Sequence, residues 1–238
     1  MITFNIKIAN RVLQINSFYE STKKYCKDFL TDEKEEFVIT LSEEDLKKEV
    51  TYQSNGQVYV NEEISALYRK IADYLIDHDI VVFHSSSFMV NNKAFLVTAR
   101  SGTGKSTHAA LLKEYLGDKF TYINDDKPLV EVKDNITVFS SPWNGKERRG
   151  NNISSPLKAV IFLSRGVDNS YNKIIDKHDI YINLMSQIYL PLEKSKREKA
   201  LHLIDIILDK ISFYEIKVNK DISSAKMTYE RIILDETE

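Results

Sequence analysis

The residues best suited to chemistry lie together in the segment 99–107, which reads Ala-Arg-Ser-Gly-Thr-Gly-Lys-Ser-Thr. The segment follows an apolar run and opens a stretch of helical periodicity, the context in which such a glycine pattern binds phosphate. Glycines let the main chain approach closely, so that backbone N–H groups and the helix dipole can hold a phosphate group. The residues expected to contact a nucleotide here are Ser101, Gly102, Thr103, Gly104, Lys105, Ser106 and Thr107.

Two side chains of this loop have distinct expected roles. Lys105 can bridge the β- and γ-phosphates and neutralise charge as the γ-phosphoryl group transfers, so it is a candidate catalytic residue. The Ser106 hydroxyl is suited to binding Mg²⁺. The usual pattern begins with glycine where this chain has Ala99, and alanine fits there if its φ is negative. The alternative interpretation is a glycine turn with a solvated lysine.

An acidic pair follows the loop by about twenty residues. Asp125 and Asp126 come at the end of a predicted strand, 120–124, where open α/β sheets bind their ligands. One carboxylate can hold magnesium while the other accepts the proton of an attacking hydroxyl. Two adjacent acids after a strand are equally compatible with a turn. His84 ends the apolar run 80–83, where a lone histidine is more often a structural residue than a catalytic one.

Composition limits the classes of protein to which this chain can belong. Among 238 residues, 33 are basic and 35 acidic, and no basic stripe interleaves with aromatic residues, so nucleic-acid binding has no support. No apolar run approaches the roughly 20 residues of a membrane span. The N-terminus lacks the pattern of a secretory signal, and the single cysteine suits a reducing compartment. We therefore expect a cytoplasmic protein with no nucleic-acid or membrane partner.

The chain is predicted to begin with a small α+β lobe at residues 1–60, followed by a nucleotide-binding domain at residues 61–238. In the lobe, strands 1–7 and 11–15 join at Ala9-Asn10, and Ser17 caps a helix over 18–30. A hairpin is expected about Asn55-Gly56. Asn61 is then expected to cap an amphipathic helix whose apolar residues recur every three or four positions.

The second part alternates predicted strands with helices around the glycine loop. Strands are expected at 80–84, 88–91, 94–98, 120–124, 129–132, 136–139, 157–163 and 213–218, with a turn at Asn92-Lys93. Helices are expected at 106–116, where Gly117 ends the helix, near 178–190, at 193–211 and from Asp221 onward. The predicted fold is α/β, with a mixed sheet flanked by helices.

These motifs together resemble the C-terminal domain of HPr kinase/phosphorylase and its small relatives, which share a nucleotide-binding core with phosphoenolpyruvate carboxykinase. The resemblance spans roughly 84–163 and rests on a histidine ending a strand, the Ser-Gly-x-Gly-Lys-Ser loop and a double aspartate. It implies that Asp125 is the catalytic base, that His84 lies near the reacting group and that Asp126 helps to bind the metal. ATP and Mg²⁺ are the cofactors it implies.

Small relatives of this family, some encoded with peptide natural-product pathways, share further short motifs with this chain. These are Asp-Asp-Lys-Pro at 125–128, Pro-Trp-x-Gly-Lys at 142–146 and Pro-Leu-Lys-Ala at 156–159. Trp143 and Arg148 are candidate nucleotide-binding residues in the second of these regions. The alternative for Trp143 is a loop anchored by a partly buried ring. The longer Glu-Ile-Arg-Gly signature of HPr kinase has only a loose counterpart at 147–150, which makes HPr a doubtful substrate.

The sequence thus predicts a kinase that uses magnesium ATP to phosphorylate a hydroxyl group. The expected acceptor is a serine or threonine of a peptide or small protein, including a natural-product precursor peptide. One rival is a small-molecule kinase with an acceptor pocket closed by Trp143 and the loop around Arg148. Another is a regulatory module that binds ATP without transfer. Fold analogy adds the option of a homo-oligomer.

Overall fold

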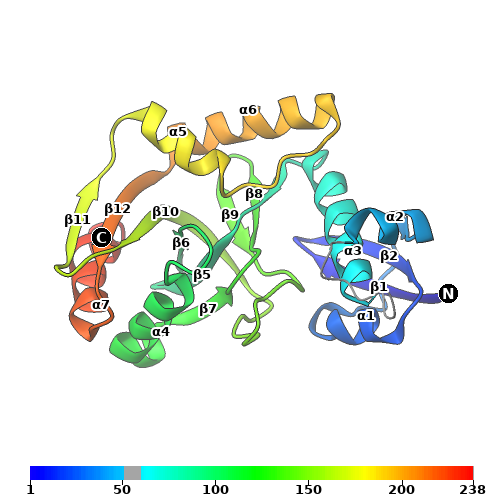
Figure 1. Cartoon of the computed structure of the whole chain (residues 1–238), viewed down its shortest axis with the longest axis horizontal. Coiled ribbons are helices and arrows are strands. Elements are labelled where there is room, and N and C mark those ends of the chain that lie inside the picture. The colour runs from blue at the N-terminus through cyan, green and yellow to red at the C-terminus, as the bar shows by residue number, and fades with distance from the viewer. Residues whose placement is uncertain (51–59, 238) are drawn as a thin grey trace. The chain divides into compact units, whose positions relative to one another are not determined.

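The structure is a computed structural model that describes residues 1–50 and 60–237 (Figure 1). The chain separates into two units, Met1–Asp77 and His78–Glu238. Helix α3, Val60–Ile76, belongs to the first unit, so the boundary falls at Asp77 rather than at residue 60. The hairpin predicted about Asn55-Gly56 lies outside the described residues.

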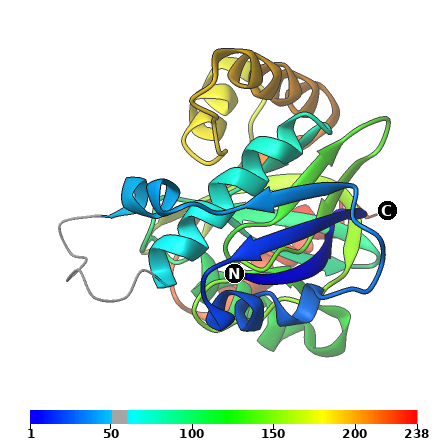
Figure 2. The same cartoon turned by 90° about the vertical axis from the view of Figure 1, so that its right-hand side faces the viewer.

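The first unit is a three-stranded sheet with helices, in the order β1-β2-β3. Its strands are β1 Ile2–Ile8, β2 Arg11–Ser17 and β3 Phe37–Thr40. Its helices are α1 Glu20–Tyr25, the 3-10 turn Lys27–Phe29, α2 Glu43–Glu49 and α3. The predicted turn between β1 and β2 is confirmed, since Ala9 and Asn10 both have positive φ. Helix α3 packs against α2 and contacts β3, as Figure 2 shows.

The helix predicted over residues 18–30 is wrong in its start and its length. Ser17 is the buried last residue of β2 and does not cap α1. The carboxylate of Glu63 instead accepts the N–H groups of Phe18, at 2.5 Å, and of Tyr19, at 3.3 Å. Glu63 comes from α3, so a contact distant in the sequence holds the segment that leads into α1, and among the described residues no side chain caps the helix itself.

The second unit is built on one large mixed sheet in the order β4-β8-β9-β10-β6-β5-β7, with β12 paired to β10 and β11 paired to β12. Its strands are β4 Ile80–Val82, β5 Ser85–Val90, β6 Lys93–Thr98, β7 Thr121–Asn124, β8 Leu129–Val132, β9 Ile136–Phe139, β10 Ser154–Arg165, β11 Ser170–Lys173 and β12 Ser212–Val218. Strand β10 pairs antiparallel with β9 at its start and parallel with β6 and β12 further along. It therefore joins two differently directed parts of the sheet.

Helices cover both faces of this sheet (Figure 1). They are α4 Lys105–Leu116 with the 3-10 turn Gly117–Lys119, α5 Lys177–Met185, α6 Lys194–Lys210, and α7 Ile222–Thr228 with the π-helical turn Tyr229–Ile233. Helices α4 and α7 pack together on one face over a core that includes Phe88, Phe95, Leu112 and Ile161. Helices α5 and α6 lie on the opposite side of the sheet in Figure 1. The predicted mixed sheet flanked by helices is observed.

Most predicted elements of this unit are present with small shifts. Strands β8 and β9 have the predicted bounds, and Gly117 ends α4 with a φ of 57°. The turn between β5 and β6 lies at Asn91-Asn92, one residue earlier than predicted, because both asparagines adopt positive φ. No helix in the described part of the chain is long and apolar enough to cross a membrane.

Candidate active site

The candidate site lies where four strands of the sheet end. Strand β5 is antiparallel to both β6 and β7, and β6 is parallel to β10, which is parallel to β12. The carboxyl ends of β6, β7, β10 and β12 therefore share one edge, and β5 begins there. This edge carries the glycine loop after β6, the acidic pair after β7 and His84 just before β5. Open α/β sheets bind their ligands at such an edge.

The glycine loop connects β6 directly to α4. Gly102 and Gly104 have φ values of 75° and 128°, which disfavour any residue with a Cβ. A Cβ at either position would meet nothing within 4 Å, so the requirement is conformational rather than steric. Ala99 is not among the described residues with positive φ, so alanine is compatible with this loop. The first N–H groups of α4 have no partners within the helix and are available to an anion.

Arg165, at the end of β10, binds the glycine loop through two of the loop's carbonyl groups. Its guanidinium donates to the carbonyl oxygen of Thr103 at 2.9 Å and also to that of Gly102. Both bonds use carbonyl groups of the loop, so they leave its N–H groups unoccupied. Arg165 thus stabilises the loop conformation from the neighbouring strand.

Lys105 and His84 form a buried polar contact beside the loop. The Lys105 ammonium donates to the Ala99 carbonyl oxygen at 3.0 Å and lies 3.3 Å from Nε2 of His84. Burial, reinforced by the charges of Lys127 and Lys105, lowers the pKa of His84 to about 4. His84 is therefore neutral near pH 7, and its Nε2 accepts from Lys105, because an ammonium group can only donate. Burial also lowers the pKa of Lys105.

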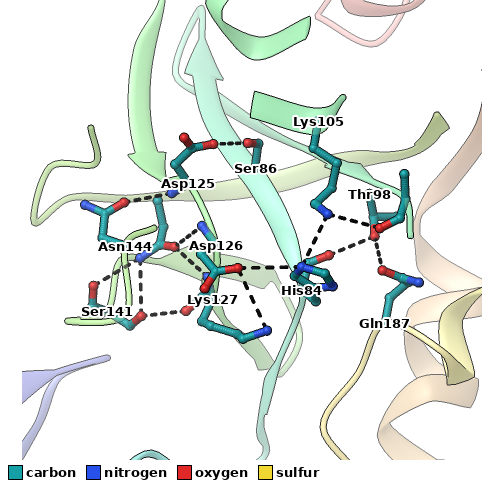
Figure 3. Close-up of polar contacts among 12 residues, drawn as sticks. His84, Ser86, Thr98, Lys105, Asp125, Asp126, Lys127, Ser141, Asn144 and Gln187 are labelled. Atoms are coloured by element: carbon teal, nitrogen blue, oxygen red, sulfur yellow. Dashed lines mark hydrogen bonds and ion pairs between the residues drawn. The ribbon is translucent and has the colours of Figure 1, made fainter. Parts of the chain in front are cut away.

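The two carboxylates of the acidic pair point to different neighbours (Figure 3). Asp125 is buried, and its carboxylate accepts hydrogen bonds from the hydroxyl groups of Ser86 and Ser106. Burial raises the pKa of Asp125, an effect that these two hydrogen bonds oppose. Asp126 is more exposed, and its Oδ1 lies 3.6 Å from Nε2 of His84 and 3.9 Å from Nζ of Lys127.

A loop that follows β9, residues 140–150, holds the acidic pair in place. Oδ1 of Asn144 accepts the N–H group of Asp125 at 2.8 Å. Gly145 has a φ of 64°, and a Cβ there would lie 3.2 Å from the backbone oxygen of Asp125. A Cβ on Gly150 would overlap the Ile123 carbonyl oxygen and lie 2.5 Å from Nδ2 of Asn144. The loop therefore packs too closely for a side chain at Gly150, whereas at Gly145 the positive φ is the main obstacle to one.

Replacing Gly150 with alanine is expected to lower the free energy of unfolding by about 2–3 kcal/mol, because the new methyl group would overlap both the Ile123 carbonyl oxygen and the Asn144 side chain, which holds the Asp125 backbone. Gly117→Ala is the control, where no neighbouring atom of the described residues opposes a Cβ but the backbone, at φ 57° and ψ −125°, disfavours one, and its expected cost is about 1–2 kcal/mol. Urea unfolding of the two variants measures both values. Equal losses of stability in the two variants would show that the loop shifts to accommodate a methyl group at Gly150, which would contradict the expected overlap.

Most of the predicted site residues line one cavity of about 740 Å³ beside the acidic pair, named here the acid-pair cavity. Those residues are His84, Ser101, Gly102, Gly104, Lys105, Ser106, Thr107, Asp125 and Asp126. Thr103 lines neighbouring cavities on the other side of the loop instead. The wall is completed by Ala110, Gly145, Lys146, Glu147 and Arg149.

Trp143 and Arg148, the candidate nucleotide-binding residues of the loop after β9, are not among the residues that line the acid-pair cavity. Trp143 is 7% exposed, and its carbonyl oxygen accepts the N–H group of Lys127 at 3.1 Å, as in a loop anchored by its ring. Arg148 adopts a positive φ. Its neighbour Arg149 does line the cavity and donates to the Ser106 carbonyl oxygen at 3.3 Å.

Sequence reasoning missed several residues that support the site. Ser86 contacts Asp125, Asn144 fixes the Asp125 backbone, and Gln187 accepts from the Thr98 hydroxyl at 2.9 Å. The Asn-Gly pair at 144–145 was a detectable turn signal. Ser86 lies in a run of three serines with nothing local to distinguish it from its neighbours, and Gln187 comes from a segment distant in sequence.

The residues of the acid-pair cavity are suited to magnesium bound with a nucleotide. Ser106 and Asp125 offer a hydroxyl and a carboxylate close enough to hydrogen-bond each other, and oxygen ligands are those that Mg²⁺ prefers. Within residues 1–50 and 60–237, no group of three or more His, Cys, Asp or Glu side chains could form a metal site. Mg²⁺ needs no such cage, because substrate phosphates and water complete its coordination.

Comparisons with known proteins give a distant likeness to solved structures. No family model matches the chain, and no curated protein matches it. Among solved structures, the HPr(Ser) kinase/phosphatase from Coxiella burnetii matches with 9% sequence identity and a TM-score of 0.38. The match covers 65% of this chain and 98% of that one. At this level the relation is a distant structural one, and the chemistry is argued from the residues of the site.

Proposed function

We propose that this chain is a kinase that uses magnesium ATP to phosphorylate a hydroxyl group, with serine of a peptide or small protein as the acceptor. The observation that carries the proposal is the meeting of Lys105, Ser106 and the acidic pair on one cavity at the carboxyl edge of the sheet. Those side chains are the set that phosphoryl transfer needs, namely a cation, a magnesium ligand and a carboxylate base.

The geometry supports an exchange of the roles expected for the two aspartates. Asp125 shares hydrogen bonds with Ser106, so this pair would hold Mg²⁺. Asp126 is more exposed and lies beside His84, so it is better placed to meet an acceptor entering from solvent. We therefore assign the base to Asp126 and the metal to Asp125 with Ser106.

In this proposal, bound magnesium ATP supplies the γ-phosphoryl group that the acceptor hydroxyl attacks. Asp126 takes the hydroxyl proton, so that the acceptor oxygen can form its bond to phosphorus as the bond to the β-phosphate breaks. Lys105 offsets the negative charge of the transferring group. His84 is neutral and accepts from Lys105, which orients that ammonium toward the cavity.

The peptide acceptor rests on the resemblance to small kinases of peptide pathways. The small-molecule rival depended on a pocket closed by Trp143 and the loop around Arg148. Lys146, Glu147 and Arg149 of that loop do line the cavity, but Trp143 is buried and is not among the lining residues. The absence of Trp143 from the lining of this cavity favours the peptide acceptor over the small-molecule rival.

The test is transfer from γ-labelled ATP and Mg²⁺ to a library of serine- and threonine-containing peptides, with a parallel panel of small hydroxyl compounds. Labelled peptide that disappears when EDTA removes Mg²⁺ is the expected result. Labelling confined to the small compounds would show that the acceptor is a small molecule rather than a peptide. ATP binding without any labelled product would overturn the proposal in favour of a regulatory module.

A further inference from the structure

A second cavity, of about 300 Å³, lies across the glycine loop from the acidic pair, and is named here the α4 cavity. It is lined by Thr107 and Leu111 of α4, by Leu163 of β10, and by Val218, Asn219 and Lys220 at the end of β12. We propose that this cavity binds the nucleoside part of the nucleoside triphosphate. The inference rests on the proposed function, which leaves the nucleoside site unassigned.

The direction of the triphosphate follows from the order of the strands. The acidic pair follows β7, whereas β10 and β12 lie on the other side of the loop strand β6. In the proposed function, Asp125, Asp126 and His84 lie at the end of the triphosphate where the phosphoryl group transfers. The nucleoside at the other end of the triphosphate must then lie toward β10 and β12. The α4 cavity lies there, and it shares Gly102, Gly104 and Thr107 with the acid-pair cavity.

A competing cavity of about 600 Å³ lies on the α5 side of the loop and is named here the α5 cavity. It is lined by Arg100 to Thr103, by Phe162 and by Ile182 and Asn183 of α5, but not by Gly104 or Thr107. The unpartnered N–H groups at the start of α4 attract the phosphate chain. Of these two cavities, the α4 cavity adjoins both those N–H groups and the ends of β10 and β12. It is therefore the better position for a nucleoside attached to the phosphate chain.

The lining of the α4 cavity suits a nucleoside. Leu111, Leu163 and Val218 offer apolar walls for a flat base, while the exposed Lys220 adds a cation near the sugar and phosphate side. His108 also lines the cavity, and its buried Nδ1 has no hydrogen-bond partner in residues 1–50 and 60–237. A buried polar atom without a partner is costly, and the polar groups of a nucleoside or its water can satisfy it.

The first experiment compares the binding of Mg-ATP and of magnesium with inorganic tripolyphosphate, which lacks the nucleoside, by calorimetry. Leu111→Trp fills the α4 cavity, and Ile182→Trp is the matched control that fills the α5 cavity. We expect Leu111→Trp to weaken ATP binding at least about tenfold and to leave tripolyphosphate binding within about twofold. Ile182→Trp is expected to change neither.

Two outcomes would overturn the inference while the proposed function stands. One is Leu111→Trp that binds ATP like the wild type, and the other is selective loss of ATP binding in Ile182→Trp. Wild-type protein that binds neither compound would instead overturn the proposed function, and the inference with it.

A second experiment needs no variant and so does not depend on folding of Leu111→Trp. An azido-adenine analogue of ATP is bound to the wild-type protein, activated by light, and the labelled residues are mapped by mass spectrometry. Labels are expected in residues 107–111, 163–166 or 218–220. Labels confined to residues 182–187 would place the base in the α5 cavity and overturn the inference.

Discussion

Lys105→Ala is expected to reduce phosphoryl transfer by at least about a hundredfold, because it removes a buried charge aimed at the transferring group. The ammonium is held between the Ala99 carbonyl oxygen and His84, at 3.0 and 3.3 Å, so no other cation can take its position without rearrangement. Initial rates with γ-labelled ATP at saturating Mg²⁺ measure the loss. ATP binding should weaken as well, since in the proposed site the same charge would contact the phosphates.

The matched control for Lys105 is Lys226→Ala, which removes the same charge from the same unit. Lys226 lies on α7 and is exposed, with Nζ 3.8 Å from Glu230 one helical turn later. Exposed pairs of this kind contribute little, so transfer should stay within about twofold of the wild-type rate. A Lys105→Ala enzyme that retained more than a tenth of the wild-type rate would contradict the role assigned to the glycine loop.

The two aspartates are expected to give different kinetic signatures when each is changed to asparagine. Asp125→Asn should raise the Mg²⁺ concentration for half-maximal rate at least about tenfold, with part of the rate recovered at high Mg²⁺, because a metal ligand has lost its charge. Asp126→Asn should lower the maximal rate at least about a hundredfold at unchanged Mg²⁺ dependence, because the proton acceptor is lost.

The measurement is a Mg²⁺ titration of the transfer rate for both variants, with thermal unfolding to show that each is folded. Asp209→Asn serves as control, since Asp209 is exposed and only pairs with Lys177 on the surface. If the Mg²⁺ dependence shifts for Asp126→Asn instead, the sequence-based assignment with Asp125 as the base is restored.

Much of the fold of the second unit could be predicted because its strands are buried. Strand β8, Leu129–Val132, and β9, Ile136–Phe139, carry clear apolar patterns between turn residues. Strand β11, Ser170–Lys173, is exposed throughout, and its sequence Ser-Tyr-Asn-Lys has no hydrophobic pattern. Strand β3, Phe37–Thr40, is apolar but has only four residues and buries only Ile39, so its short run does not show the alternation of a half-buried strand. Helix α2 was missed for the same reason, since Leu46 is its one buried residue.

The candidate site could be predicted where its chemistry is local in sequence. The spacing of Gly102, Gly104 and Lys105 identifies the glycine loop in the sequence, and two adjacent aspartates after a predicted strand are equally easy to recognise. The roles proposed above for Asp125 and Asp126 could not be predicted, because the argument for them depends on Ser86 and Ser106 lying beside one carboxylate and His84 beside the other. Those neighbours come from strands and loops that only the sheet brings together.

Strand β10 makes the folding of the second unit depend on pairings between distant parts of the sequence. Through β6, β9 and β12 it brings together segments far apart in sequence, pairing Leu157 with Ala94 and Ala159 with Ser212. Such distant pairings close long loops, which makes folding slow compared with local contacts. The pairing of β5 with β6 and β7 brings the glycine loop and the acidic pair together, and Arg165 of β10 additionally holds the loop. A ligand that needs both would bind only the folded sheet, so by mass action its binding would raise the melting temperature of the unit as a whole.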